Sequence, residues 1–248
     1  MPDAFFANRT ALVTGGARGI GRAISQMLAE GSARVAVNYE RNEAAARETV
    51  ELCRAAGVEA EAFQADISDP EAVERLVAAV RAAFGPIDLL VNNAGIFNQR
   101  THDKLTFAEW RRMFQVNLDG MFLVTWAVKD EMIARRFGRI VNISSLAGVV
   151  KKPGMIHYAT AKAAVIAFSR SCSEAFAPHV RVNCVAPGLT DTEMARSADP
   201  ALLAQLIAIT PLGRIGQPEE IARVVRFLLS EDSSFVTGQT IVACGGRV

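Results

Sequence analysis

The sequence lacks the features that mark membrane, exported and nucleic-acid-binding proteins. No apolar run approaches the ~20 residues that a bilayer-spanning helix needs, and even residues 201–209 are interrupted by Gln205. The first residues carry neither the basic stretch nor the long apolar stretch of a signal peptide. Lys and Arg number 27 against 26 Asp and Glu, so no net charge attracts nucleic acid or anionic lipid. We therefore expect a cytoplasmic protein without a nucleic-acid or membrane partner.

Cysteine is scarce, and its spacing carries no metal or disulfide pattern. The four cysteines (Cys53, Cys172, Cys184 and Cys244) lie far apart, with no C-x-x-C pair and no histidine at metal-ligand spacing. We expect free buried thiols and no metal site. Half of the residues are hydrophobic and 21% are charged, which is the balance of a chain that buries a large core.

Short apolar, β-branched runs alternate with longer segments of helical period. We expect strands over residues 10–14, 35–39, 60–65, 87–91, 139–143, 181–186 and 240–242. We expect helices over residues 20–30, 42–56, 70–84, 107–134, 157–177 and 218–229. Asp69 before Pro70, and Thr106 with Glu109, supply caps for two of these helices.

The alternation predicts the fold class. Strands that are joined by crossover helices run parallel, and right-handed crossovers place helices on both faces of the sheet. We therefore expect an α/β protein in which residues 1–248 form a single domain, a doubly wound (Rossmann) and mainly parallel seven-stranded sheet. One long segment, residues 188–216, lies outside the alternation and is a candidate lid over a substrate.

A glycine-rich loop, T-G-G-A-R-G-I-G at residues 14–21, follows the first expected strand and leads directly into a helix. The glycines permit a tight turn and close backbone approach. The helix N-terminus offers free N–H groups and a partial positive charge to a pyrophosphate. A glycine-rich loop by itself is also compatible with a simple turn, but a strand before it and a helix after it favour dinucleotide binding.

The end of the second expected strand bears on which dinucleotide binds. An acidic residue at this place usually accepts a hydrogen bond from the adenosine 2′-hydroxyl of NAD. Here the place falls near Tyr39, followed by Glu40 and Arg41, and Arg18 lies in the glycine loop. Two guanidinium groups favour a 2′-phosphate, so we expect NADP(H). The alternative is NAD(H), with Glu40 as the ribose acid and both arginines as solvated surface charges.

Tyr158 and Lys162 lie four residues apart at the start of an expected helix, and therefore on one face. A free tyrosine titrates near 10, and an adjacent cation is expected to lower this pKa, which makes Tyr158 a usable acid and base. Ser145 follows an expected strand at the sheet edge where ligands bind, so its hydroxyl is placed to donate to a substrate oxygen. Each feature alone also has a structural interpretation, as a surface pair or a turn.

Together these motifs resemble the short-chain dehydrogenase/reductase family over nearly the whole chain. The shared features, in order, are the glycine loop at residues 14–21, N-N-A-G at residues 92–95, Asn117, Ser145, Tyr158 with Lys162, and Pro187-Gly188. Within the family, P-L-G-R at residues 211–214 and G-Q-P-E at residues 216–219 resemble the 3-oxoacyl-[acyl-carrier-protein] reductase branch. Residues 96–102 and Cys244, at a position where aspartate is common, depart from that branch.

The resemblance implies roles for individual residues. Tyr158 would be the catalytic acid and base, Lys162 would bind the nicotinamide ribose, Ser145 would polarise the carbonyl, and Asn117 would hold a proton-relay water. The implied cofactor-binding residues are Gly15, Arg18, Gly19, Ile20, Gly21, Tyr39, Arg41, Asp66, Ile67, Asn93, Ala94, Gly95, Tyr158, Lys162, Pro187, Gly188, Thr190 and Thr192. Structural alternatives stay open for three of them: Asp66 as a loop cap, Asn93 as a support of the sheet edge, and Thr192 as a helix start.

The expected function is an NADP(H)-dependent hydride transfer between the nicotinamide and a carbonyl or secondary alcohol, such as a 3-oxoacyl thioester. The alternatives are an NAD(P)-dependent dehydrogenase of a sugar, polyol or steroid, and a non-catalytic dinucleotide-binding module. Arg135, Arg136 and Arg139 are candidates to receive an acidic acyl carrier protein, or equally to complement a helix dipole. The resemblance also implies a homotetramer, assembled in part through the expected helix at residues 107–134.

Overall fold

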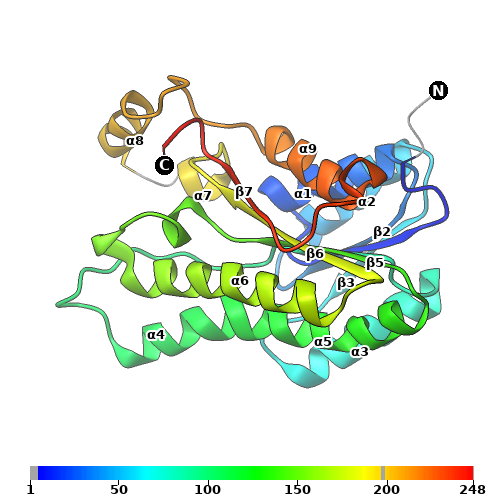
Figure 1. The fold of residues 1–248 in the computed structure, drawn as a ribbon. Helices are drawn as coiled ribbons and strands as arrows, with labels where there is room; N and C mark the ends of the chain where they lie inside the picture. The colour runs from blue at the N-terminus through cyan, green and yellow to red at the C-terminus, as the bar shows by residue number, and fades with distance from the viewer. Residues whose placement is uncertain (1–4, 197–198, 248) are drawn as a thin grey trace.

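The computed structural model describes residues 5–196 and 199–247. Residues 1–4, where a signal peptide was judged absent, and residues 197–198 of the candidate lid lie outside this part. Within it, seven strands form one sheet in the order β3-β2-β1-β4-β5-β6-β7, and every neighbouring pair is parallel (Figure 1). This arrangement confirms the predicted doubly wound fold.

The strands begin and end close to the predicted positions. They are β1 (Thr10–Val13), β2 (Arg34–Tyr39), β3 (Ala60–Gln64), β4 (Leu89–Asn92), β5 (Gly138–Ile143), β6 (Val180–Pro187) and β7 (Thr240–Ala243). The principal helices are α1 (Gly19–Glu30), α2 (Glu43–Ala55), α3 (Pro70–Phe84), α4 (Phe107–Phe114), α5 (Gly120–Ala134), α6 (Ile156–Ala175) and α9 (Pro218–Leu229). The predicted caps of α3 and α4 are present, since Asp69 accepts from Glu71 N and Thr106 forms a capping box with Glu109.

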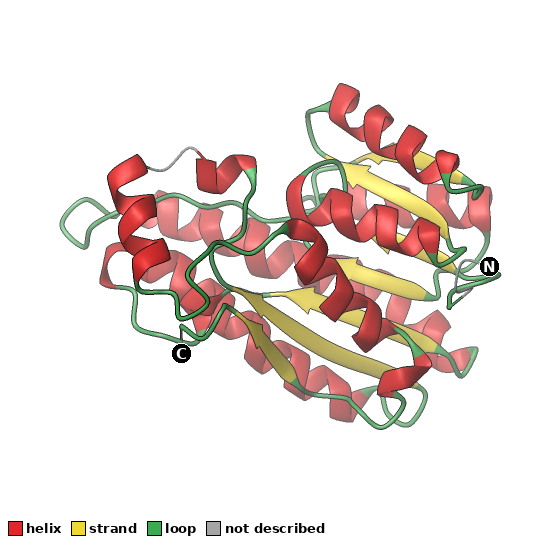
Figure 2. Ribbon diagram, turned by 90° about the horizontal axis from the view of Figure 1, so that it is seen from above, coloured by secondary structure: helices red, strands yellow, loops and turns green. Residues whose placement is uncertain are grey.

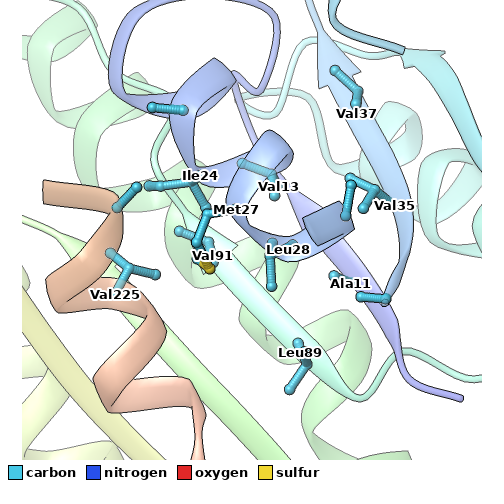
Figure 3. Close-up of a cluster of buried hydrophobic side chains, with 14 of the residues drawn as sticks. Ala11, Val13, Ile24, Met27, Leu28, Val35, Val37, Leu89, Val91 and Val225 are labelled. Atoms are coloured by element: carbon cyan, nitrogen blue, oxygen red, sulfur yellow. The ribbon is translucent and has the colours of Figure 1, made fainter. Parts of the chain in front are cut away.

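Helices cover both faces of the sheet (Figure 2). Successive residues of a strand point to opposite faces, so a sheet that is buried on both sides needs continuous apolar runs. In β1, Val13 packs in the cluster that includes α1 and α9, whereas Leu12 packs in the cluster that includes α3 and α5. Figure 3 shows the first cluster, in which Ile24 and Leu28 of α1 lie against the strands and Val225 of α9 lies beside them.

The sheet order fixes the place of the ligand cleft. From β1 the chain adds β2 and β3 on one side, and β4 to β7 on the other. In open α/β sheets, ligands bind beyond the carboxyl ends of the strands where the order reverses. That point lies between Val13 of β1 and Val91 of β4, which pair directly. The glycine loop and the N-N-A-G motif leave the sheet at these two ends.

The predicted helix over residues 107–134 is interrupted. A π-helical turn over Gln115–Asp119 separates α4 from α5, and Asn117 lies inside it. The Asn117 side chain donates from Nδ2 to the Met113 carbonyl at 3.1 Å, in competition with regular main-chain pairing. Single π-helical turns inside α-helices occur frequently at functional sites. Hydrophobic periodicity does not reveal this turn, because the apolar positions continue through it.

The segment 188–216 contains two short helices that were not predicted, α7 (Glu193–Arg196) and α8 (Pro200–Ala208). Asp199 caps α8 by accepting from Ala201 N at 2.9 Å. The α8 sequence, PALLAQLIA, is apolar nearly all round, so a one-sided apolar stripe, the usual sign of a helix in sequence, is missing. None of its residues is buried. Over the described ranges, no helix is long and apolar enough to cross a bilayer.

Candidate active site

The glycine loop has the backbone conformation that its glycines predict. Gly15 and Gly19 have φ values of +60° and +54°, a left-handed region that favours glycine. A Cβ atom on Gly21 would clash with the carbonyl oxygen of Gly15. Helix α1 begins after Arg18, which makes no side-chain cap, so the N–H groups of the first turn are not capped by it. The cradle therefore fits the pyrophosphate of a dinucleotide.

Side chains from β2 and from the residues that follow β1 and β4 hold the glycine loop in place. Thr14 Oγ1 accepts from the backbone N–H groups of Asn93 at 3.0 Å and Ala94 at 3.1 Å. Asn93 Nδ2 donates in return to the carbonyl oxygens of Thr14 and Gly15. Asn93 therefore supports the sheet edge, as the structural alternative proposed. Asn38, which sequence reasoning missed, is buried in β2, and its Oδ1 accepts from Gly15 N at 3.2 Å.

The two arginines expected to select NADP(H) are both paired with carboxylates. Glu40 and Arg41 follow Tyr39, the last residue of β2. Arg41 Nη2 lies 2.8 Å from Glu40 Oε1, and the Arg41 side chain is largely exposed. Arg18 donates from Nη1 to Glu193 at 2.7 Å, so it links the glycine loop to α7. Both guanidinium groups are thus at the expected place but are engaged within the chain.

Asp66 and Ile67 follow β3 and differ in their surroundings. Asp66 Oδ1 accepts from the backbone N–H and the hydroxyl of Ser68, which matches the alternative of a loop cap. Burial raises the pKa of Asp66, but the hydrogen bonds from Ser68 and the charge of Arg112 outweigh it and hold this pKa below its ordinary value. Ile67 is buried, and it packs so closely on Gly120 that no Cβ would fit there.

Helix α6 brings Tyr158 and Lys162 to one face, as predicted. Lys162 Nζ lies 5.9 Å from the centroid of the Tyr158 ring. The ammonium is buried and donates to the Ile143 carbonyl at the end of β5, at 3.0 Å. Ser144 donates to the Lys162 carbonyl at 2.7 Å, and the side chain of Ser145 is near enough to Tyr158 to lower the pKa of the phenol. The three residues predicted around the reacting oxygen are therefore together.

Asn117 reaches this cluster from the π-helical turn. Its Nδ2 donates to the Ile96 carbonyl at 3.0 Å, while its buried Oδ1 has no hydrogen-bond partner in the described part of the chain. A Cβ atom placed on Gly95 would lie 2.6 Å from Asn117 Oδ1 and 3.4 Å from Lys162 Nζ. Because Gly95 has no Cβ atom, Asn117 Oδ1 and the Lys162 ammonium both lie beside the same open position.

The pKa of Tyr158 departs from the expectation. Burial raises this pKa above its ordinary value, and the nearby Ser145 side chain offsets only part of the effect. Lys162 was expected to lower it, but its Nζ faces the Ile143 carbonyl and lies nearly 6 Å from the ring. Burial also lowers the pKa of Lys162 to about 8. The residues of the chain itself therefore keep the phenol protonated near neutral pH.

The end of β6 is closely packed against the C-terminal segment. Gly188, which follows Pro187, donates from its N–H to the Ala243 carbonyl at 2.8 Å. A Cβ atom on Gly188 would lie 2.7 Å from the Cα atom of Cys244, so only glycine fits. Cys244 is a buried free thiol, as are the other three cysteines.

Thr190 and Thr192 lie at the start of the segment 188–216. Thr190 forms an isolated parallel bridge with Gly216, which closes the base of the segment. Thr192 Oγ1 accepts from Ala195 N at 3.4 Å and so starts α7, the structural alternative named for it. A Cβ atom on Gly19 would lie 3.2 Å from the Thr192 methyl group, so this threonine also borders the glycine loop.

Comparison with known proteins decides the family. The family model for short chain dehydrogenases matches residues 9–202, which include the glycine loop and the cluster around Tyr158. The chain belongs to the short-chain dehydrogenase family. It is accordingly an NAD(P)-dependent oxidoreductase.

Relatives within the short-chain dehydrogenase family match nearly the full length. Acetoacetyl-CoA reductase of Shinella zoogloeoides is 41% identical over 97% of this chain and 98% of its own. A 3-oxoacyl-[acyl-carrier protein] reductase of Brucella melitensis, solved with bound NAD, is 39% identical, with a TM-score of 0.90 over 100% of this chain and 94% of its own. A variant of actinorhodin polyketide ketoreductase, solved with NADPH, is 35% identical, with a TM-score of 0.92 over 96% and 97%.

One contact of this short-chain dehydrogenase was missed by sequence reasoning. The Phe97 ring packs edge-on against Tyr158, with centroids 5.1 Å apart and planes at 79°. Buried His157 places Nε2 2.6 Å from Oδ1 of Asn98, the residue after Phe97. In the sequence, residues 96–102 differ from the 3-oxoacyl-[acyl-carrier-protein] reductase branch. This difference marked the segment as unusual but did not predict which residues it contacts.

The three arginines considered as a docking site for a carrier protein differ in their contacts. Arg135 is paired with buried Asp88 at 2.9 Å, and Arg139 is paired with Glu231 at 3.1 Å. Arg136 is exposed, and it has a left-handed φ of +57° at the end of α5. Two of the three side chains therefore serve the fold of this short-chain dehydrogenase.

Proposed function

We propose that this short-chain dehydrogenase is an NADP(H)-dependent reductase of 3-oxoacyl thioesters or similar ketones. The observation that carries the proposal is the convergence of Ser145, Tyr158 and Lys162 at the sheet edge that also holds the glycine loop. Two relatives are named for reduction of acetoacetyl-CoA and of 3-oxoacyl groups on acyl carrier protein, which supports a 3-oxoacyl substrate.

The residues around Tyr158 supply an acid and a hydrogen-bond donor for the reduction. Bound NADPH supplies the hydride. Ser145 donates to the carbonyl oxygen as charge develops on it, and Tyr158 donates the proton. Because burial keeps the pKa of Tyr158 high, its phenol is protonated and ready to act as an acid. The Lys162 ammonium would bind the nicotinamide ribose, and its pKa of about 8 keeps it mostly charged near neutral pH.

The preference for NADP(H) rests on Arg18 in the glycine loop and Arg41 after β2, whose guanidinium groups would exchange their carboxylate partners for a 2′-phosphate. Glu40 remains the residue that would favour NAD(H), since it follows Tyr39 at the position of the ribose acid. One solved relative holds NADPH and another holds NAD. The ratio of the dissociation constants for NADPH and NADH tests this preference, and equal affinities would refute it.

The segment 188–216 is proposed as a lid over this site. One of its ends borders the glycine loop through Thr192 and Gly19. The other end is held by the Leu212 N–H, which donates to the Gly245 carbonyl at 3.1 Å. Between these ends, Leu202 and other apolar side chains of α8 are not buried, which suits a cover for an apolar substrate chain.

A homotetramer is proposed for the assembly, with the α5 face as one interface. Phe122 and Trp126 stack on α5 with centroids 4.3 Å apart, and their side chains are 37% and 42% exposed. Phe168 of α6 packs against the same pair. Exposed aromatic clusters of this kind mark protein interfaces.

A screen of NADPH oxidation over carbonyl classes tests the proposed reaction. We expect turnover with an acetoacetyl thioester and none with ketoses. NADPH oxidation confined to sugars, or NADP+ reduction confined to polyols, would replace the substrate class and keep the reaction. No oxidation with any carbonyl, in protein that binds NADPH, would refute the enzyme function.

A further inference from the structure

Arg18 is held by a carboxylate that belongs to the proposed lid. Its Nη1 lies 2.7 Å from Glu193 Oε2, and the two side chains are 63% and 68% exposed. The contact between Gly19 and Thr192 lies directly beside this ion pair in both segments. The pair therefore joins the glycine loop to α7 at the point where α1 begins.

From this pairing we infer that Glu193 is a specificity-determining residue that weakens the binding of NADPH relative to NADH. The inference rests on the proposed role of Arg18 in binding the 2′-phosphate. That phosphate and the Glu193 carboxylate compete for the Arg18 guanidinium, because two anions that share one cation repel each other, so binding of the phosphate weakens the ion pair. The Glu193 carboxylate also remains near the Gly19 end of the cleft as a negative charge facing an anionic cofactor.

NADH carries a hydroxyl in place of the 2′-phosphate. It therefore does not need the Arg18 guanidinium and leaves the ion pair with Glu193 intact. The pyrophosphate is common to both cofactors, so its repulsion by Glu193 cancels in the ratio of their affinities. The second arginine differs, since Arg41 pairs with the adjacent Glu40 within its own segment. NADPH therefore disturbs the ion pair between the glycine loop and the proposed lid, whereas NADH does not.

A neighbouring ion pair provides a matched control. Asp191 accepts two hydrogen bonds from Arg196, at 2.7 and 3.0 Å, within the same segment. Asp191→Asn removes one negative charge and one ion pair from the segment, as Glu193→Gln does, but it leaves Arg18 untouched. A general effect of charge or of lid stability would therefore appear in both variants.

The experiment measures the dissociation constants of NADPH and NADH for the wild type, Glu193→Gln and Asp191→Asn. Adenosine 2′,5′-bisphosphate and AMP serve as probes of the adenosine end alone. An exposed ion pair contributes little, so we expect Glu193→Gln to bind NADPH and the bisphosphate about two- to fivefold more tightly. NADH and AMP should gain less than NADPH and the bisphosphate, and Asp191→Asn should leave the NADPH to NADH ratio unchanged.

Several outcomes would overturn the inference. One is an unchanged affinity of Glu193→Gln for NADPH, and another is an equal gain in affinity for NADPH and NADH. A third is the same gain from Glu193→Gln in an Arg18→Ala background, which would show that Glu193 does not act through Arg18. The wild-type ratio tests the proposed NADP(H) preference separately. A wild type without preference would refute that proposal, while the shift in Glu193→Gln would still decide the role of Glu193.

Discussion

At the scale of single residues, burial governs the ionisation of the groups around the site. Tyr158, Lys162 and His157 all shift toward their neutral forms, because desolvation is the largest cause in each case. Tyr158 is therefore a protonated acid near neutral pH, and Lys162 loses its proton at a lower pH than an exposed lysine does. The protonation states of the site therefore depend on the burial of these side chains as much as on their charged neighbours.

His157 is expected to make stability depend on pH. Burial lowers its pKa, Glu109 raises it less, and Arg100 lowers it further. Above about pH 6.5, His157 is neutral in the folded and unfolded states, so it adds no pH dependence. As the pH falls below that value, the unfolded chain binds the proton first, and the free energy of unfolding decreases.

Urea unfolding between pH 5 and 8 measures this effect. The stability of the wild type relative to His157→Gln should fall as the pH decreases below about 6.5. His102→Gln is the control, because His102 is exposed. Parallel stability curves for the wild type and His157→Gln would contradict the effect of burial on this histidine.

At the scale of elements, Arg181 fastens β6 to the end of α9. Its guanidinium donates to the carbonyl oxygens of Leu228 at 2.9 Å and Ser230 at 2.7 Å, and to the Ser233 hydroxyl at 2.8 Å. Arg181 is buried, and no carboxylate within the described ranges pairs with it. The free carbonyls at the C-terminus of α9 act as its counter-charge.

Arg181→Met should therefore lower the free energy of unfolding by about 2–4 kcal/mol, because several buried acceptors lose their donor. Arg223→Met is the matched control on α9, since Arg223 is exposed, and it should change the stability by less than about 0.5 kcal/mol. Denaturant unfolding measures both variants. If Arg181→Met and Arg223→Met have equal free energies of unfolding, water satisfies the acceptors of Arg181 as well as the guanidinium does.

The elements also show what the sequence could predict. The strands, the crossover helices and the glycine loop were predictable, because periodicity and glycine requirements are local properties. The bond from Asn117 in the π-helical turn to the Ile96 carbonyl, and the link from Asn38 to Gly15, join residues that tertiary structure brings together. The α8 helix gave no signal because its apolar residues are not sorted to one side.

The site was predictable in its members but not in its interactions. Tyr158 and Lys162 were placed together by helical spacing alone. The opposite pKa shift of Tyr158 follows from burial, which spacing does not report. The contact of Phe97 with Tyr158, and the carboxylate partner of Arg18, join segments far apart in sequence. Such pairings require the fold.

At the scale of the whole molecule, the exposed aromatic pair on α5 predicts assembly. Light scattering after size-exclusion chromatography should give four times the mass of one chain for the wild type. Trp126→Glu should reduce that mass, because a charge at the centre of an apolar interface is costly to desolvate. Leu52→Glu, which places the same charge at a similarly exposed apolar residue of α2, should keep the mass of the wild type. A monomeric wild type would contradict the proposed interface.

The most direct measurement compares turnover and cofactor binding in Tyr158→Phe. We expect kcat with NADPH and an acetoacetyl thioester to fall about 10²–10⁴-fold, because the proton donor is lost while Ser145 and Lys162 remain. The dissociation constant for NADPH should stay within about twofold of the wild type. If Tyr158→Phe binds NADPH and keeps the wild-type kcat, Tyr158 is not the proton donor.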